Sequence, residues 1–398
     1  LNTVPRIIWK QEPLGNAIPM GAVANEEILI LLVEPFDEDK PQTESGRYFL
    51  VALRLSDGQQ LWKREAADLT YTFAEQIALD DGRLFVASVA GLKALDCRTG
   101  KVLWHRKETW KDETFSNCLK VHRGLIYVSF KTGEIKAFRQ SDGAQVWESH
   151  SAKAGSPAFF RDRLVAKTVD DADIEAINLT NGHILWRKKL PAMFSWLKRI
   201  PVGETGSPAV SNGLAIITVI GKGTAGPLMG SWANLKIPSY VAALDLETGK
   251  LWWKSELPNL GAYEVAVDSG RVYVGCYSGE VVCFDLRTGR RLWKTKPPQK
   301  NPVDPAKGSG WPYALPVVIS GEVVIVGTRS GDLFGLSGKN GKVLWQMTIS
   351  NRGMGLRDPI LIAGGYIVVI NGPEVLALRP QENHNPSKQV NLTNSAMK

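Results

Sequence analysis

The residue types that most often carry chemistry are sparse in this chain and stand apart from one another. The five histidines are dispersed, and no two of them have the spacing expected of metal ligands. The four cysteines form no CxxC motif and no adjacent pair, so neither a zinc site nor a redox centre is indicated. From these residues we expect no catalytic group, no metal site and no bound cofactor.

One segment, Gly221-Lys222-Gly223-Thr224, is similar to part of a phosphate-binding loop. Its spacing is incomplete, and it lacks the strand–loop–helix context in which backbone amides cradle a phosphate. Cys276 and Cys283 flank a predicted hairpin turn, but their offset register disfavours a disulfide. Single residues therefore leave the function open.

A repeated unit runs through almost the whole chain. The segment Ala94–Trp104 (ALDCRTGKVLW) returns as Ala243–Trp253 (ALDLETGKLWW), and looser copies follow the same rule, with a tryptophan four residues after a glycine. Successive repeat tryptophans are 39 to 67 residues apart. A fixed unit with a period near 40 residues indicates a repeat architecture.

Each unit is expected to form four short β-strands joined by glycine turns. In the sixth unit the predicted strands are Tyr263–Val267, Arg271–Cys276, Val281–Asp285 and Arg290–Trp293. Turns that end in glycine, such as Asp80-Asp81-Gly82 and Ser211-Asn212-Gly213, mark the first hairpin in other units. This alternation of β-branched runs and tight turns predicts an all-β protein.

Two partial units at the chain ends complete the set. Val375–Leu378 matches a third strand, and Arg6–Lys10 matches a fourth strand that ends near a tryptophan. If the two ends meet, seven whole units and one shared unit give an eight-bladed β-propeller of four-stranded antiparallel blades, closed by the N-terminal strand. We expect one propeller domain over residues 1–380, and a polar tail over residues 381–398 that is disordered or bound to a partner.

The residues of the unit have structural roles in such a ring. The glycine permits a turn with positive φ, the Asp or Asn binds turn amides, and the small alanine leaves room for an indole. The repeat tryptophans should then form much of the core between blades. These predicted docking residues are Trp9, Trp62, Trp104, Trp147, Trp186, Trp253, Trp293 and Trp345.

The A-x-D-x-x-T-G-x-x-x-W unit resembles the tryptophan-docking motif of pyrroloquinoline-quinone (PQQ) type propellers, over roughly Pro5 to Pro380. One branch of these propellers, the quinoprotein dehydrogenases, is longer and carries a vicinal cysteine pair, Ca²⁺ ligands and a catalytic Asp, and this chain has no vicinal cysteines. The chain looks more like the other branch, the BamB-type outer-membrane assembly lipoproteins, which have eight blades and no cofactor. The resemblance implies a periplasmic or otherwise extracytoplasmic, membrane-associated protein.

The longest connections are predicted to lie on one face of the propeller. They are Glu34–Arg47, His105–Asn117, Arg187–Gly206, Ile220–Tyr240, Lys294–Trp311 and Gln346–Arg357. Loops on a rigid scaffold are common binding sites, and aromatic residues with nearby arginines are typical anchors. We predict partner binding there; the alternative is that these side chains cap the propeller's own loops. The candidate residues are Trp110, Phe194, Trp196, Arg199, Trp232, Trp311 and Arg357.

The net charge of the 398-residue chain is +8. Basic residues such as Lys63, Arg187 and Lys254 directly follow repeat tryptophans, where charge on an outer edge strand discourages edge-to-edge pairing. A functional basic surface is the alternative, although no nucleic-acid-binding module is evident. No apolar run is long enough to span a membrane, and a signal or lipid anchor could precede Leu1.

The sequence therefore favours a non-enzymatic scaffold that binds a protein partner in a membrane-associated complex. Two alternatives stay open: a PQQ- and Ca²⁺-dependent quinoprotein dehydrogenase, and a propeller that binds peptides or glycans on the same face.

Overall fold

A computed structural model describes most of the repeat units and the strands within them. The described residues are 3–12, 18–34, 48–66, 69, 76–110, 115–130, 133–150, 157–167, 173–190, 208–219, 239–258, 265–276, 279–298, 317–328, 331–349 and 360–379.

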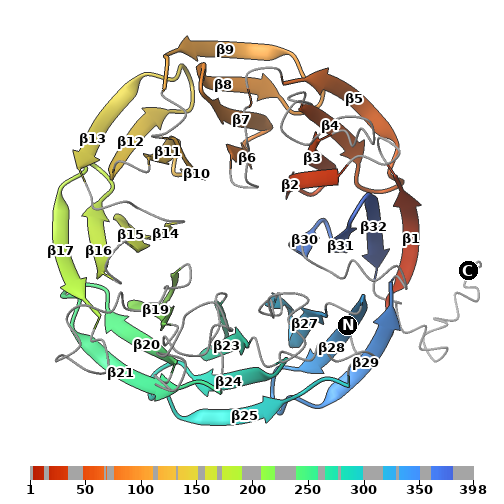
Figure 1. The fold of residues 1–398 in the computed structure, drawn as a ribbon, viewed down its shortest axis with the longest axis vertical. Coiled ribbons are helices and arrows are strands. Elements are labelled where there is room, and N and C mark those ends of the chain that lie inside the picture. The colour runs from red at the N-terminus through yellow and green to blue at the C-terminus, as the bar shows by residue number, and fades with distance from the viewer. Residues whose placement is uncertain are drawn as a thin grey trace, which may run out of the picture.

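The described strands form eight four-stranded antiparallel sheets, arranged as the blades of a closed ring (Figure 1). The predicted all-β, eight-bladed propeller is thus confirmed. Within each blade the strands run in order from the centre of the ring to its outer edge (Figure 1). Among the described residues there is no helix long and apolar enough to cross a membrane.

The blades follow the chain order. Blades 1 to 4 are β2 (Ile18–Ala24), β3 (Ile28–Glu34), β4 (Phe49–Arg54), β5 (Gln60–Glu65); β6 (Ile77–Asp80), β7 (Arg83–Ser88), β8 (Gly91–Asp96), β9 (Val102–Lys107); β10 (Phe115–His122), β11 (Leu125–Phe130), β12 (Glu134–Arg139), β13 (Gln145–His150); and β14 (Ala158–Phe160), β15 (Arg163–Lys167), β16 (Asp173–Asn178), β17 (Ile184–Lys189). Blades 5 to 8 are β18 (Ala209–Ser211), β19 (Leu214–Val219), β20 (Tyr240–Asp245), β21 (Leu251–Glu256); β22 (Val265–Asp268), β23 (Arg271–Gly275), β24 (Val281–Asp285), β25 (Arg291–Thr295); β26 (Val317–Ser320), β27 (Val323–Gly327), β28 (Asp332–Ser337), β29 (Val343–Thr348); and β30 (Leu361–Ala363), β31 (Tyr366–Asn371), β32 (Glu374–Arg379), β1 (Arg6–Gln11).

The N-terminal strand closes the ring, as predicted. Strand β1 pairs antiparallel with β32, and Trp9 lies opposite Ala377. An ion pair of 2.6 Å between Lys10 Nζ and the buried carboxylate of Glu374 ties the same two strands together. Blade 8 is therefore built from both ends of the chain (Figure 1).

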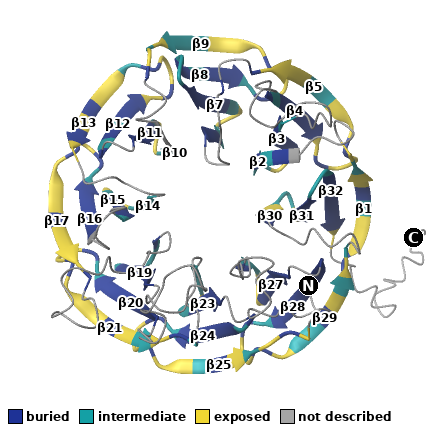
Figure 2. Cartoon of the chain, in the orientation of Figure 1, coloured by how far each residue is buried: buried dark blue, intermediate teal, exposed yellow. Residues whose placement is uncertain are grey.

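The core lies between the blades. The second and third strands of a blade are buried on both sides, because each sheet packs against the sheets before and after it. One core cluster, for example, joins Leu32 and Leu50 of blade 1 to Leu84 and Leu95 of blade 2. The fourth strands form the outer rim of the ring and expose most of their side chains (Figure 2).

The two hairpin turns of a blade lie on the same face, which we name the short-turn face. In blade 2 the backbone N–H of Cys97, at the turn between the third and fourth strands, donates to Gly82 O, in the turn between the first and second strands, at 3.0 Å. The same bond recurs in blades 1, 3, 4, 5, 6 and 7. Positive φ values at residue pairs such as Asn212 (49°) and Gly213 (76°) show why the sequence places Asn-Gly and Asp-Gly there.

The other connections leave the opposite face, which we name the long-loop face. They join the second strand to the third within a blade, and the fourth strand to the first strand of the next blade. The described strands that bracket the six long segments end at this face, as the topology predicted.

Candidate interaction surface

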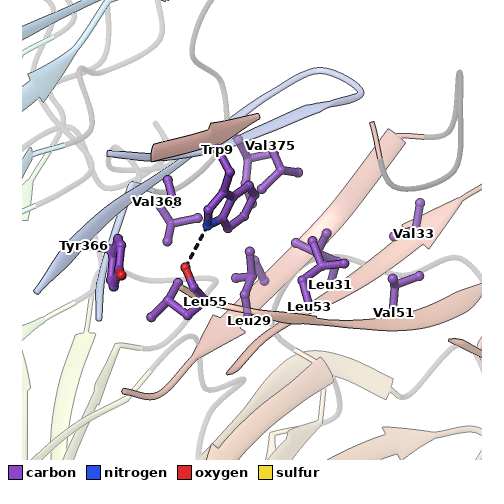
Figure 3. Close-up of a cluster of buried hydrophobic side chains, with 13 residues drawn as sticks. Trp9, Leu29, Leu31, Val33, Val51, Leu53, Leu55, Tyr366, Val368 and Val375 are labelled. Carbon is purple, nitrogen blue, oxygen red and sulfur yellow. Dashed lines mark hydrogen bonds between the residues drawn. The ribbon is translucent and has the colours of Figure 1, made fainter. Parts of the chain in front are cut away.

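The docking tryptophans join each blade to the next. The indole N–H of Trp253 in blade 5 donates to the carbonyl of Leu286 in blade 6 at 2.8 Å. The closing strand uses the same contact, since Trp9 Nε1 donates to Leu55 O at 2.7 Å across the junction of blades 8 and 1 (Figure 3). Equivalent bonds are made by Trp62, Trp104, Trp147, Trp186 and Trp293. The eighth, Trp345, is buried between blades 7 and 8. These indoles therefore lie where one blade packs against the next.

A small residue lies opposite each docking indole in the neighbouring third strand. Ala243 faces Trp253, and five further alanines hold the same position, as the repeat predicted. In blades 6 and 7 the position is taken by Cys283 and Gly335. The repeat pattern missed these two because it was defined by alanine, although both satisfy the same requirement for little volume.

The repeat glycine packs against the docking indole of the preceding blade. Gly289 has a φ of +69°, and a Cβ added to it would lie 2.5 Å from the ring of Trp253. The glycine is thus required twice, by the left-handed turn and by the flat surface it offers to the ring. This second requirement was not predicted from the sequence.

The aspartate of the repeat stabilises the same turn. Asp285 Oδ1 accepts from Thr288 Oγ1 and from the Thr288 backbone N–H, both at 2.8 Å. The hydrogen bond from the Thr288 hydroxyl, with help from the turn amides, lowers the pKa of Asp285 below the usual aspartate value. Asp96 and Asp245 make the same contacts with Thr99 and Thr248, and their pKa values are lowered for the same reason. The Asp–Thr hydrogen bonds that recur in these three turns therefore stabilise the fold.

Trp110 does not belong to an exposed binding surface. It lies in the connection between blades 2 and 3, where only 5% of its surface is exposed. Its ring packs edge-on against Phe130, with centroids 5.2 Å apart, and tilted against Phe138. Its backbone N–H donates to Val89 O at 2.9 Å. The prediction that Trp110 anchors a partner is corrected: its side chain caps the propeller's own core, which was the alternative.

The remaining predicted partner-binding residues lie outside the described residues. They are Phe194, Trp196, Arg199, Trp232, Trp311 and Arg357. The described strands on either side of their segments all end at the long-loop face. That face is accordingly the candidate interaction surface.

The four cysteines are free thiols buried within the blades. Burial raises the pKa of Cys276 and of Cys283 to about 12, so neither thiol is poised as a thiolate nucleophile. Although they share a hairpin, Cys276 and Cys283 are not bonded to each other. Their role is to fill space, and in the case of Cys283 to face a docking tryptophan.

Glu134, Glu148 and His150 bring three potential metal-ligand atoms within 4.8 Å of one another at the long-loop end of blade 3. The sequence did not single them out, because Glu134 and His150 meet only through strand pairing. The ammonium of Lys136 lies 3.7 Å from Glu148 Oε2 and supplies a positive charge to the cluster. This arrangement is that of a surface ion-pair network.

The sequence matches a known protein family over most of its length. The model of the family described as outer membrane protein assembly factor BamB matches residues 47–226 and 238–382. The chain belongs to the BamB family. It is 25% identical over 248 residues to the outer membrane protein assembly factor BamB of Moranella endobia (strain PCIT), an alignment that covers 58% of each protein. The match thus spans less than two thirds of that relative's length.

Solved structures share the fold. The crystal structure of BamB from Moraxella catarrhalis superposes with a TM-score of 0.63 and 18% identity, covering 96% of this chain and 99% of that one. A quinohemoprotein alcohol dehydrogenase from Pseudomonas putida HK5 superposes with a TM-score of 0.61 and 12% identity, covering 94% of this chain and 76% of the enzyme. At these identities the likeness concerns the propeller alone, which BamB proteins and quinoproteins have in common.

Proposed function

We propose that this BamB-family propeller is a non-enzymatic scaffold for outer-membrane protein assembly, located in the periplasm at the membrane, and that it holds a protein partner on its long-loop face. Family membership supports the assembly role. The choice of face rests on the distribution of the loops. The long connections leave strand ends on one face, while the described hairpins of the other face are short turns.

On this proposal the partner-contacting residues are Trp196 and Trp232 as principal anchors, with Phe194, Arg199, Trp311 and Arg357 around them. Large aromatic side chains and arginines supply most of the binding energy in protein interfaces. The short-turn face has fewer backbone groups available for a partner, because its turns form hydrogen bonds with one another and with the docking indoles.

The test is capture of partner proteins from solubilised native membranes by the tagged chain. We expect the double variant W196A/W232A to lose stoichiometric partners while its melting temperature stays unchanged. The matched control is L103A, which removes an apolar side chain with 51% of its surface exposed on the outer rim and should leave capture intact. Full capture by W196A/W232A would refute the proposed face.

The likeness to a quinohemoprotein dehydrogenase gives the enzyme alternative a direct test. Incubation with PQQ and Ca²⁺ should produce no visible chromophore and no dye-linked dehydrogenase activity. A bound chromophore would replace the scaffold proposal with the enzyme. Binding of short peptides or oligosaccharides, with no protein captured from membranes, would favour the third function.

A further inference from the structure

A patch of the outer rim combines exposed apolar and basic side chains. It is formed by the neighbouring fourth strands β17 and β21, whose blades are joined by the bond from Trp186 Nε1 to Leu246 O at 2.9 Å. We name it the β17–β21 edge and define it by Ile184, Leu185, Lys188, Lys189, Leu251 and Trp252, all exposed.

The apolar part of this edge originates in a bulge. In each blade the register shifts just before the docking tryptophan, which leaves one extra residue on the outer strand. In blades 4 and 5 the extra residue is Leu185, 41% exposed, and Trp252, 61% exposed. At the same position in blades 1 and 6, Leu61 and Leu292 are partly buried. Leu103 in blade 2, 51% exposed, and Val146 in blade 3, 44% exposed, hold the same position, so the β17–β21 edge is distinguished by its tryptophan, 61% exposed, and not by apolar exposure alone.

The lysines of this edge make no ion pair with the described carboxylate side chains. Among the described residues no carboxylate pairs with Lys188 or Lys189, whereas Arg187 is bound through two nitrogens to the buried Glu175. Glu256 at the end of β21 is the one acidic residue within the two strands. Other rim strands carry charges that are paired, because on β9 Arg106 pairs with Glu108, and Glu148 of β13 pairs with Lys136 of β12.

We propose that the β17–β21 edge docks directly on an anionic phospholipid bilayer. An exposed tryptophan and aliphatic side chains insert at the headgroup boundary, while lysines extend their charged ends to lipid phosphates. Each lysine near a negatively charged membrane surface adds to the attraction, and the chain's net charge of +8 acts in the same direction. The contact lies on the outer rim of the ring, and its lysines lead into the Arg187–Gly206 connection, so lipid binding and partner binding are separated by the variants below and not by position alone.

The experiment is flotation of the purified chain with vesicles of phosphatidylcholine alone, or of phosphatidylcholine with phosphatidylglycerol, at low and high ionic strength. Wild type should float with the anionic vesicles and be released by salt. K188E/K189E should bind about tenfold more weakly or worse. L185E/W252E should fail to float with the anionic vesicles at low as well as at high ionic strength. The matched control L61E/L292E alters the same repeat position on blades 1 and 6 and should bind like wild type.

Melting temperatures of all variants must match wild type, and W252A provides a milder second variant if L185E/W252E does not fold. The proposal is overturned if wild type does not float with anionic vesicles. It is equally overturned if L61E/L292E weakens vesicle binding as much as K188E/K189E and L185E/W252E do. It is also overturned if the edge variants float normally but lose a captured protein, since the edge is then a protein interface. W196A/W232A should float like wild type, so failure of partner binding and failure of lipid binding are read separately.

Discussion

The docking indoles satisfy three requirements at the residue scale: burial of a large ring, a hydrogen bond for its N–H, and a flat surface on which to lie. Trp253 shows all three, with Leu286 O as acceptor and Gly289 beneath the ring. The adjacent Trp252 makes a similar bond, to Arg287 O at 2.9 Å, but stays mostly exposed. Two neighbouring tryptophans therefore separate the effect of burial from that of the hydrogen bond.

We expect W253A to reduce the free energy of unfolding by about 3–5 kcal/mol, because it removes a buried aromatic side chain and leaves a cavity. W252A should reduce it by about 1 kcal/mol or less, since an exposed ring and one solvent-accessible hydrogen bond are lost. Chemical denaturation of both variants provides the measurement. Equal losses would show that Trp253 has no special docking role.

A second residue-scale prediction concerns the glycine beneath the indole. G289A should destabilise the protein by both left-handed backbone strain and overlap with Trp253. G270A, in the same blade, has a φ of +76° but meets nothing within 4 Å, so it reports the strain alone, about 1–2 kcal/mol. The difference between their thermal stabilities isolates the docking contact. No difference would mean that the indole can shift away without loss.

The turn aspartates predict how stability depends on pH. Their folded pKa values lie below the unfolded value near 3.9, so the stability they contribute is present above that pH and is lost as pH falls through the lowered values. Replacing Thr99, Thr248 and Thr288 with Val should raise the folded pKa values towards the unfolded one. The drop in unfolding free energy between pH 6 and pH 3 should then be smaller than in wild type. An equal or larger drop would contradict this assignment.

At the scale of elements, the strands were predictable because each repeat carries its own turn signals. In blade 6 the predicted third strand, Val281–Asp285, matches β24, and the second exceeds β23 by Cys276 alone. The bulge before each docking tryptophan could not be predicted, because it depends on pairing between strands. Trp110 was misassigned for a similar reason: its burial depends on Phe130, a residue of the next blade that no local pattern connects to it.

Closure of the ring by β1 predicts that this strand contributes strongly to the stability of the fold. Removing residues 1–11 deletes the pairing with β32, the Lys10–Glu374 ion pair and the Trp9 dock. We expect an unfolding free energy at least about 3 kcal/mol lower, from the loss of buried Trp9 alone, and rapid proteolysis at the opened junction. Deleting residues 383–398 is the matched control and should leave the melting temperature unchanged. A stable propeller without β1 would show that closure is dispensable.

At the scale of the whole molecule, the two proposals assign different surfaces of the ring to different partners. The short-turn face is engaged in internal bonds, the long-loop face is proposed for a protein partner, and the β17–β21 edge for lipid. The fold and the direction of the long connections followed from the repeats. The residues proposed to bind the partner lie in segments outside the repeat pattern, where neither periodicity nor the described strands fix their positions.

The most direct test of the central claim is site-specific photo-crosslinking in native membranes. A photoreactive side chain would replace Lys107 or His150 at the long-loop end of exposed strands, and Asp81 or Ser269 in the turns of the opposite face. We predict crosslinks to an assembly-machinery protein from Lys107 or His150 and none from the turn positions. Crosslinks that arise from the turns and not from the long-loop end would contradict it.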